Sequence, residues 1–125
     1  MTELKRRVDK LNEHIINGDT LTAMELFYAD NVIMQENEEK PRIGKQECLD
    51  NEKRNLEKVK KVNSKLLNQA IDPEKNVVSS EWEIIFTTMT DEKFKLTEVS
   101  IQQWDDEGQV VKEKFYYKDM YPLKE

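Results

Sequence analysis

The first half of the chain carries apolar residues at helical spacing. Residues 2–17 predict an amphipathic helix, because one stripe of its surface is apolar while charged residues lie outside it. The stripe consists of Leu4, Val8, Leu11 and Ile15. Thr2 is a suitable cap for the start of this helix. Its end is predicted at Asn17-Gly18, since glycine tolerates the left-handed conformation that terminates helices.

The segment that follows is divided into short elements. Asp19 or Thr20 caps a second, short helix. An apolar, β-branched run predicts a strand over residues 31–36. Helical spacing returns over residues 45–58, where Cys48 is expected as a small buried side chain.

After residue 60 the apolar residues alternate with period two, which is typical of strands. Four runs show this alternation, over residues 62–71, 77–89, 94–104 and 109–118. The breaks between them are turn-like, so neighbouring strands are expected to pair as antiparallel hairpins. Helices followed by such a meander predict an α+β domain whose sheet curls around the helices. Both faces of the second run carry apolar residues, so one face is expected to meet the helices and the other a second subunit.

The composition of the chain limits the kinds of partner that it is expected to bind. The chain has 125 residues, with 20 basic and 26 acidic side chains and a net charge of −6. This length fits one domain over residues 1–125. An acidic chain is a poor partner for nucleic acid, which requires a basic surface. No window is apolar enough for a membrane span, and neither a signal segment nor a disulfide framework is evident, so a cytoplasmic protein without membrane contacts is expected.

Several kinds of site lack the residues that they need. The only histidine is His14 and the only cysteine is Cys48, so a zinc site built on several histidines cannot form. Neither glycine-rich phosphate motif is present. We therefore expect neither a metal nor a cofactor.

Two stretches carry a resemblance to a known superfamily. Residues 27–50 read FYADNVIMQENEEKPRIGKQECLD, with Tyr-Ala-Asp, an apolar strand, an acidic residue, a polar loop and Gly-Lys before a helix. Residues 104–119 read WDDEGQVVKEKFYYKD, a hairpin with an acidic turn, a glycine and paired apolar residues. Together they resemble the SnoaL-like and nuclear transport factor 2-like superfamily, and the match in element order covers nearly the whole chain.

The resemblance implies a particular architecture. Members have three N-terminal helices packed in a strongly curved, mixed or antiparallel sheet, and the resulting cone holds a central cavity. Many members dimerise through the outer face of the sheet. The superfamily includes ketosteroid isomerases, polyketide cyclases, dehydratases, epoxide hydrolases and non-catalytic binding domains, so the fold does not decide the function.

The resemblance to ketosteroid isomerases implies a carboxylate base at the end of the first strand. Aligned without gaps from Tyr-Ala-Asp, this position is Glu36; aligned from the Pro-Arg-x-Gly stretch, it is Gln35. Glu36 is favoured, since strands tolerate gaps less well than loops, and the alternative is a solvated glutamate at a strand end. The oxyanion donors of that family fall at Leu11 and Ser100. Because leucine cannot donate a hydrogen bond, steroid isomerisation is not expected.

The other chemistries of the superfamily find less support in this chain. Its epoxide hydrolases use an aspartate–arginine–aspartate arrangement on the sheet, and no arginine follows residue 60. Its dehydratases use paired histidines. Its polyketide cyclases use an aspartate with little other machinery; the strands between residues 60 and 104 contain no aspartate outside the turns, although Glu81, Glu83 and Glu98 could substitute.

Alternation predicts which residues line the cavity. The inward set of the third run is polar with an aromatic end: Glu98, Ser100, Gln102 and Trp104. The outward set is Val99, Ile101 and Gln103. In the last run the shared face carries Val111, Glu113, Phe115 and Tyr117. The residues predicted to contact a ligand are Gln35, Trp82, Phe86, Ser100, Gln102, Trp104, Phe115, Tyr117 and the titratable His14. The alternatives are that the aromatic residues fill the core and that His14 is half exposed.

Two functional hypotheses follow. The first is a protein that binds a small, partly apolar molecule in the cone, with cofactor-free acid–base chemistry of the isomerase or cyclase type and Glu36 as the base. The second is a non-catalytic dimerisation or protein-interaction domain, which the missing oxyanion donors favour. An enclosed polar cavity would favour the first hypothesis, and a cavity filled by aromatic side chains would favour the second.

Overall fold

The computed structural model describes residues 2–123 and confirms the three predicted helices. They are α1 (Glu3–Ile16), α2 (Thr20–Phe27) and α3 (Lys45–Glu57). Thr2 caps α1 as expected, since its Oγ1 accepts a hydrogen bond of 3.1 Å from the backbone N–H of Lys5. Gly18 follows the end of α1 with a φ of +84°, the left-handed conformation that a side chain would strain. No helix among the described residues has the length and apolar character needed to cross a membrane.

The strands largely follow the predicted runs. They are β1 (Tyr28–Glu36), β2 (Arg42–Ile43), β3 (Val59–Asp72), β4 (Val77–Thr88), β5 (Lys93–Trp104), β6 (Val110–Tyr116) and β7 (Tyr121–Pro122). The first strand begins three residues earlier than predicted, because the chain passes directly from the end of α2 into β1. The two-residue strands β2 and β7 were not predicted, since so short a segment carries no periodic signal.

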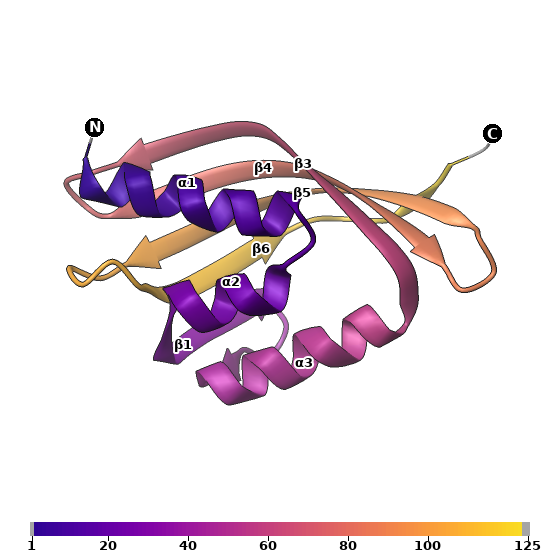
Figure 1. Ribbon diagram of the computed structural model, residues 1–125, viewed down its shortest axis with the longest axis horizontal. Helices are drawn as coiled ribbons and strands as arrows, with labels where there is room; N and C mark the ends of the chain where they lie inside the picture. The colour runs from indigo at the N-terminus through magenta and orange to yellow at the C-terminus, as the bar shows by residue number, and fades with distance from the viewer. Residues whose placement is uncertain (1, 124–125) are drawn as a thin grey trace.

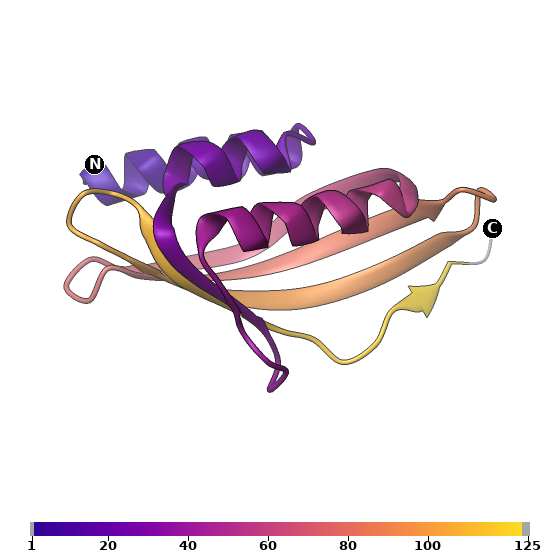
Figure 2. The same cartoon turned by 90° about the horizontal axis from the view of Figure 1, so that it is seen from below.

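The sheet is mixed, and all three helices lie on its concave face (Figures 1 and 2). The strand order is β2-β1-β6-β5-β4-β3, with β7 paired to β5. Strands β3 to β6 form an antiparallel meander, as predicted. The exception is β1, which lies parallel to β6 and thus brings together segments about 80 positions apart. This arrangement is the α+β cone that the resemblance implies.

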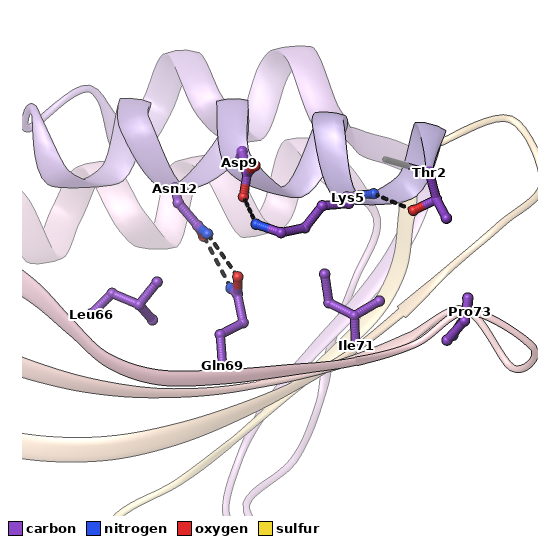
Figure 3. A pocket seen from close by; sticks show the side chains of 8 residues that line it. All are labelled: Thr2, Lys5, Asp9, Asn12, Leu66, Gln69, Ile71 and Pro73. Atoms are coloured by element: carbon purple, nitrogen blue, oxygen red, sulfur yellow. Dashed lines mark hydrogen bonds and ion pairs between the residues drawn. The ribbon is translucent and has the colours of Figure 1, made fainter.

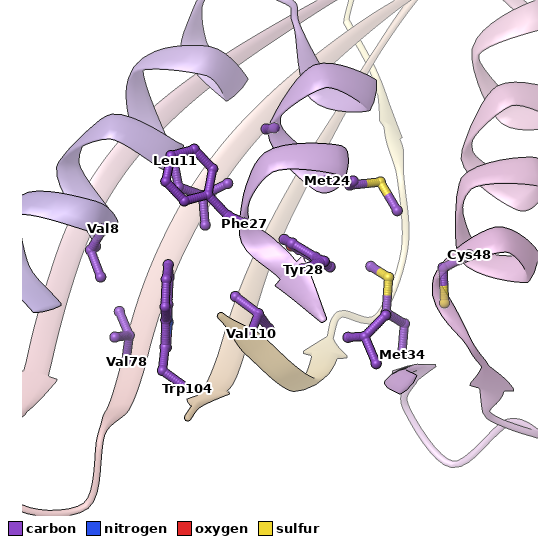
Figure 4. Close-up of a cluster of buried hydrophobic side chains, with 12 residues drawn as sticks. Val8, Leu11, Met24, Phe27, Tyr28, Met34, Cys48, Val78, Trp104 and Val110 are labelled. Atoms are coloured by element: carbon purple, nitrogen blue, oxygen red, sulfur yellow. The ribbon is translucent and has the colours of Figure 1, made fainter. Parts of the chain in front are cut away.

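The hydrophobic core lies between α1, α2 and the sheet (Figure 4). Its buried residues are Val8, Leu11, Ala23, Met24, Phe27, Tyr28, Val32, Met34, Cys48, Val78, Trp104 and Val110. One predicted inward position is wrong by a residue: Val110 is fully buried, whereas Val111 is only half-buried. The cause is a register shift, since Trp104 pairs with Val110 while Gln103 pairs with Lys112.

Helix α3 crosses the concave face from one edge of the sheet to the other. It packs against β1 and β2 at one edge and against β3 at the opposite edge. The inner face of β4, β5 and β6 lies between these supports (Figure 2). Several side chains that point inward here are only half-buried: Ile84, Phe86, Glu98 and Phe115. The inward side chains beneath α1 and α2 are mostly buried, whereas these four beneath α3 keep partial contact with solvent.

Candidate functional site

A buried network of hydrogen bonds occupies the inner face where β1, β5 and β6 meet. The hydroxyl of Tyr28 donates to Oε1 of Glu113. The side-chain amide of Gln102 donates to Oε2 of Glu113 at 2.9 Å, and the indole N–H of Trp104 donates to Oε1 of Gln102 at 3.0 Å. No side chain of this network is more than 5% exposed. Glu113 therefore depends on these protein donors in place of water.

Strand pairing brings these residues together. Gln102 of β5 lies directly opposite Glu113 of β6, and Met34 of β1 lies opposite Glu113 on its other side. Tyr28 is the first residue of β1, where the chain leaves α2 and its ring enters the core. Since paired residues on neighbouring strands point to the same face, all these side chains face the helices.

Burial and hydrogen bonding have opposite effects on the pKa of Glu113. Burial raises its pKa to about 7, although the hydrogen bonds from Tyr28, Gln102 and Ser100 lower it. Burial, followed by the nearby charge of Glu113, raises the pKa of Tyr28 well above its ordinary value, so the phenol remains a donor. Near neutral pH the Glu113 carboxyl thus lies at the midpoint of its titration.

Glu98 is the second perturbed carboxyl on the same face. It lies opposite Trp82 of β4 and is half-buried on the α3 side of the network. Within residues 2–123 no hydrogen bond or ion pair holds its carboxyl group. Burial, and then the charges of Glu113, Glu36 and Glu52, raise its pKa to about 8. At pH 7 the Glu98 side chain is consequently a neutral carboxylic acid with access to solvent.

Two further carboxylates border this region. Glu52 is contributed by α3, and burial followed by the charge of Glu36 raises its pKa. Glu36, the predicted base, lies at the end of β1 and forms an ion pair with Arg42 of β2. Its side chain is 24% exposed. The Nε atom of Arg42 is buried and has no hydrogen-bond partner among residues 2–123. Among the described residues, no group of three or more His, Cys, Asp or Glu side chains is arranged to hold a metal ion.

Most predicted lining residues do face inward. Ser100, Gln102 and Trp104 are buried in and beside the network, and Trp82 is buried opposite Glu98. Phe86 and Phe115 are half-buried on the same face. Tyr117 is half-buried just beyond β6, where burial and then the charge of Glu36 raise its pKa.

Gln35 and His14 lie apart from the predicted cavity wall. Gln35 pairs with Lys114, on the opposite face from Glu36, and its amide donates to the backbone oxygen of Glu39 at 2.8 Å. The structure therefore favours Glu36 over Gln35 as the inward residue. His14 packs against Phe27, with ring centroids 6.1 Å apart, at the α1–α2 contact. Cys48 is buried, as predicted, and its thiol approaches the backbone oxygen of Arg42 at 3.8 Å.

The sequence interpretation missed Glu113, Tyr28 and Glu52 as site residues. The sequence did contain a signal for Glu113, because it is a carboxylate at an inward position of the last strand, where the alternating pattern predicts an apolar residue. Tyr28 carried no such signal, since its role depends on the parallel pairing of β1 with β6. Glu52 lies on a polar helix, where one inward glutamate cannot be distinguished from the solvated ones.

A separate groove of about 540 Å³ lies between α1 and β3 (Figure 3). It is lined by Thr2, Lys5, Asp9, Asn12, Leu66, Gln69, Ile71 and Pro73. The amides of Asn12 and Gln69 bond each other across it, at 3.1 and 3.4 Å (Figure 3). None of the carboxylates described above lines this groove, so it is distinct from the region beneath α3.

No protein-family model and no curated protein matches the sequence. Solved structures nevertheless share the fold over almost the whole chain. A protein from Mesorhizobium loti described as a SnoaL-like polyketide cyclase is 20% identical, with a TM-score of 0.76 and coverage of 94% of this chain and 100% of that one. An NTF2-like protein of unknown function from Burkholderia pseudomallei is 12% identical, with a TM-score of 0.80 and coverage of 94% and 92%. SalBIII is 14% identical, with a TM-score of 0.82 and coverage of 97% and 96%; it is described as an epoxide hydrolase/cyclase-like enzyme with a role in pyran ring formation in the polyether salinomycin.

Proposed function

We propose that this chain, which has the SnoaL-like and nuclear transport factor 2-like fold, is a cofactor-free acid–base enzyme of the cyclase type. Its substrate would be a small, partly apolar molecule bound beneath α3, against the inner face of β4, β5 and β6. The half-buried aromatic side chains Phe86 and Phe115 offer apolar contacts there. Two structural neighbours are described as cyclases or cyclase-like, which supports this class of reaction.

The observation that carries the proposal is the state of Glu98. A general acid must reach the substrate and hold its proton at working pH. Glu98 meets both conditions, since it is half-buried with a free carboxyl group and its pKa is raised to about 8. Glu36 meets the first condition, but its carboxylate is paired with Arg42. We therefore assign the acid–base role to Glu98 and retain Glu36 as the residue to compare with it.

One carboxyl group suffices for a cyclisation. The O–H of Glu98 would donate its proton to the oxygen of a carbonyl or epoxide as the C–O π or σ bond breaks. The electron pair of an internal nucleophile would form the new bond to that carbon. The proton released by the nucleophile would return to the Glu98 carboxylate. The product is an isomer of the substrate, so the step needs no oxidant, reductant or cofactor.

Ligand discovery comes first in the test of this proposal. Native mass spectrometry of gently purified protein should show an adduct of small-molecule mass, which would identify the compounds to test for turnover. Cyclic ketones, lipophilic acids and epoxides form the starting panel. Protein that carries no adduct and is unmoved by the panel would favour the interaction-domain hypothesis.

Variants of the two candidate carboxyl groups then identify the residue that acts as the acid and base. Glu98→Gln should lower turnover by about 100-fold or more, the usual contribution of a general acid or base. Glu83→Gln is the matched control, since Glu83 lies on the outer face of β4. Unchanged turnover in Glu98→Gln, with loss in Glu36→Gln, would transfer the role to Glu36. Loss in neither variant would overturn acid–base catalysis by these carboxyl groups.

We also propose that two copies pair through the outer face of the sheet. This face carries Val99, Ile101 and Tyr116, of which Val99 is 36% and Tyr116 44% exposed. Glutamates gather on the β4 side of the face and lysines on the β6 side, so a two-fold pairing can match opposite charges. Sedimentation at micromolar concentration should show a dimer that Val99→Lys dissociates; a monomeric wild-type protein would overturn the pairing.

A further inference from the structure

The order of donors and acceptors in the buried network is set by the indole of Trp104. An indole N–H donates a hydrogen bond but cannot accept one. The amide atom that it contacts at 3.0 Å must therefore be the oxygen of Gln102. The NH₂ end of the same amide then faces Oε2 of Glu113 at 2.9 Å. Because an NH₂ group only donates, this oxygen of Glu113 must accept.

The second oxygen of Glu113 is also an acceptor. The Tyr28 hydroxyl donates to Oε1, so both carboxyl oxygens face donors. A carboxylate fits this arrangement. A carboxylic acid could carry its O–H only on Oε1, where the Tyr28 hydroxyl would have to reverse and accept, because the Gln102 NH₂ group cannot accept at Oε2. Since Glu113 is only 3% exposed, water cannot replace a donor that is lost.

We infer that Trp104 is a positioning residue, whose indole N–H holds the Gln102 amide in the orientation that stabilises the carboxylate form of Glu113. Burial disfavours a charge on Glu98, and the charge of an ionised Glu113 disfavours it further. The catalytic meaning of the Glu98 proton rests on the proposed function of Glu98. The hydrogen-bond order itself is independent of any activity.

Other titratable groups act on this pair of carboxyls. On β1, Tyr28 hydrogen-bonds Glu113 and, besides burial, the charge of Glu36 raises the pKa of Glu98, while on α3 the charge of Glu52 raises both pKa values. Tyr117, just beyond β6, also interacts with the charge of Glu98. On α1, Arg7 and His14 both lie against the ring of Phe27. All the charges named for Glu98 are negative, so they raise its pKa together.

Trp104→Phe provides the test, because it preserves an aromatic ring and removes only the N–H group and the indole's second ring. Carbon-13 titration of the glutamate carboxyls in the full chain would follow Glu113 and Glu98, each assigned through its Gln variant. In Trp104→Phe the Gln102 amide is free to reverse and accept from a protonated Glu113. We expect the Glu113 midpoint to rise by about one pH unit. The Glu98 midpoint should fall, since a neutral Glu113 no longer opposes its ionisation.

Opposite shifts of the Glu113 and Glu98 midpoints distinguish a positioning role of Trp104 from a packing role. A looser core would hydrate both carboxyls and lower both midpoints toward the ordinary value. Gln102→Met should raise the Glu113 midpoint as Trp104→Phe does, and the double variant should add nothing further, because Trp104 acts through Gln102. Trp82→Phe makes the same change at the other buried tryptophan, whose indole has no hydrogen-bond partner within residues 2–123. It should leave the Glu113 midpoint unchanged.

Two results would overturn the inference. The first is a Trp104→Phe protein in which both midpoints fall or neither moves. The second result would come from wild-type protein, so it applies even if the variant fails to fold. We expect the indole N–H resonance of Trp104 to shift as Glu113 titrates, and we expect this shift to be absent in Glu113→Gln. An indole resonance indifferent to this titration would contradict the inference. Neither measurement needs a substrate, so an unsuccessful search for turnover would leave both results intact.

Discussion

Tyr28 shows how one hydroxyl supports a buried charge. Its O–H is one of the donors to the Glu113 oxygens, together with the Gln102 amide and the Ser100 hydroxyl. Tyr28→Phe retains the buried ring and removes only this donor. We expect the Glu113 pKa to rise and the free energy of unfolding at pH 8 to fall by about 1–3 kcal/mol, the cost of an unsatisfied buried group.

Carboxyl titration and urea denaturation measure these two effects. Tyr116→Phe is the matched control, because Tyr116 is 44% exposed on the outer face. A Tyr28→Phe protein with an unaltered Glu113 midpoint would show that the carboxylate does not depend on the Tyr28 hydroxyl.

At the scale of elements, one contact ties α1 to the β5–β6 turn. Nε of Arg7 donates to the backbone oxygen of Gly108 at 2.6 Å, and the Arg7 guanidinium lies 4.7 Å from the ring centroid of Phe27. Gly108 has a φ of +77°, and a Cβ there would lie 2.5 Å from the Arg7 side chain. This glycine is thus required both by its backbone conformation and by the approach of Arg7.

Two glycines allow these requirements to be separated. Gly18→Ala should cost about 1 kcal/mol of unfolding free energy, since Gly18 has a positive φ but open space around it. Gly108→Ala should cost roughly 2–3 kcal/mol, because it also displaces Arg7. Urea denaturation followed by tryptophan fluorescence measures both. In an Arg7→Ala background the two costs should converge; a difference that persists would place its cause elsewhere.

The elements were predictable from local periodicity, and the site was predictable only in part. Alternation along β5 placed Glu98, Ser100, Gln102 and Trp104 on one face, as the pairing confirms. The parallel pairing of β1 with β6 joins segments about 80 positions apart, and no local pattern encodes it. The role of Tyr28 follows from this pairing. The bulge beside Val110 likewise depends on β5, since register is a property of two strands.

At the scale of the whole molecule, the raised pKa values of Glu98 and Glu113 predict that folding takes up protons. Both values, about 8 and about 7, lie above the ordinary value of 4.5. The stabilisation is therefore complete below about pH 4.5 and is lost as the pH rises through 7 and 8. Between pH 5.5 and 8.5 we expect the free energy of unfolding to fall, with Glu98 contributing roughly 3 kcal/mol of the loss.

Urea denaturation of wild type and Glu98→Gln at the two pH values tests this expectation. The variant should lose less stability over the interval, because it has no proton to release at this position. Glu83→Gln, on the outer face, should follow the wild-type curve. Equal losses in wild type and Glu98→Gln would mean that Glu98 ionises in the folded protein as it does in the unfolded chain.

The parallel pairing of β1 with β6 has a consequence for the order in which the chain folds during synthesis. A ribosome releases β1 well before β6, the strand beside which it lies, since the two are about 80 positions apart. Until then Val32 and Met34 have no sheet to cover them, whereas β3, β4 and β5 can join as local hairpins in the order of synthesis. We expect pulsed hydrogen exchange during refolding to protect the β3–β5 meander before β1; simultaneous protection would argue against this order. The buried carboxylate would then be enclosed only when β6 joins β1, so a nascent chain stalled before residue 110 would expose apolar surface of the kind that chaperones bind.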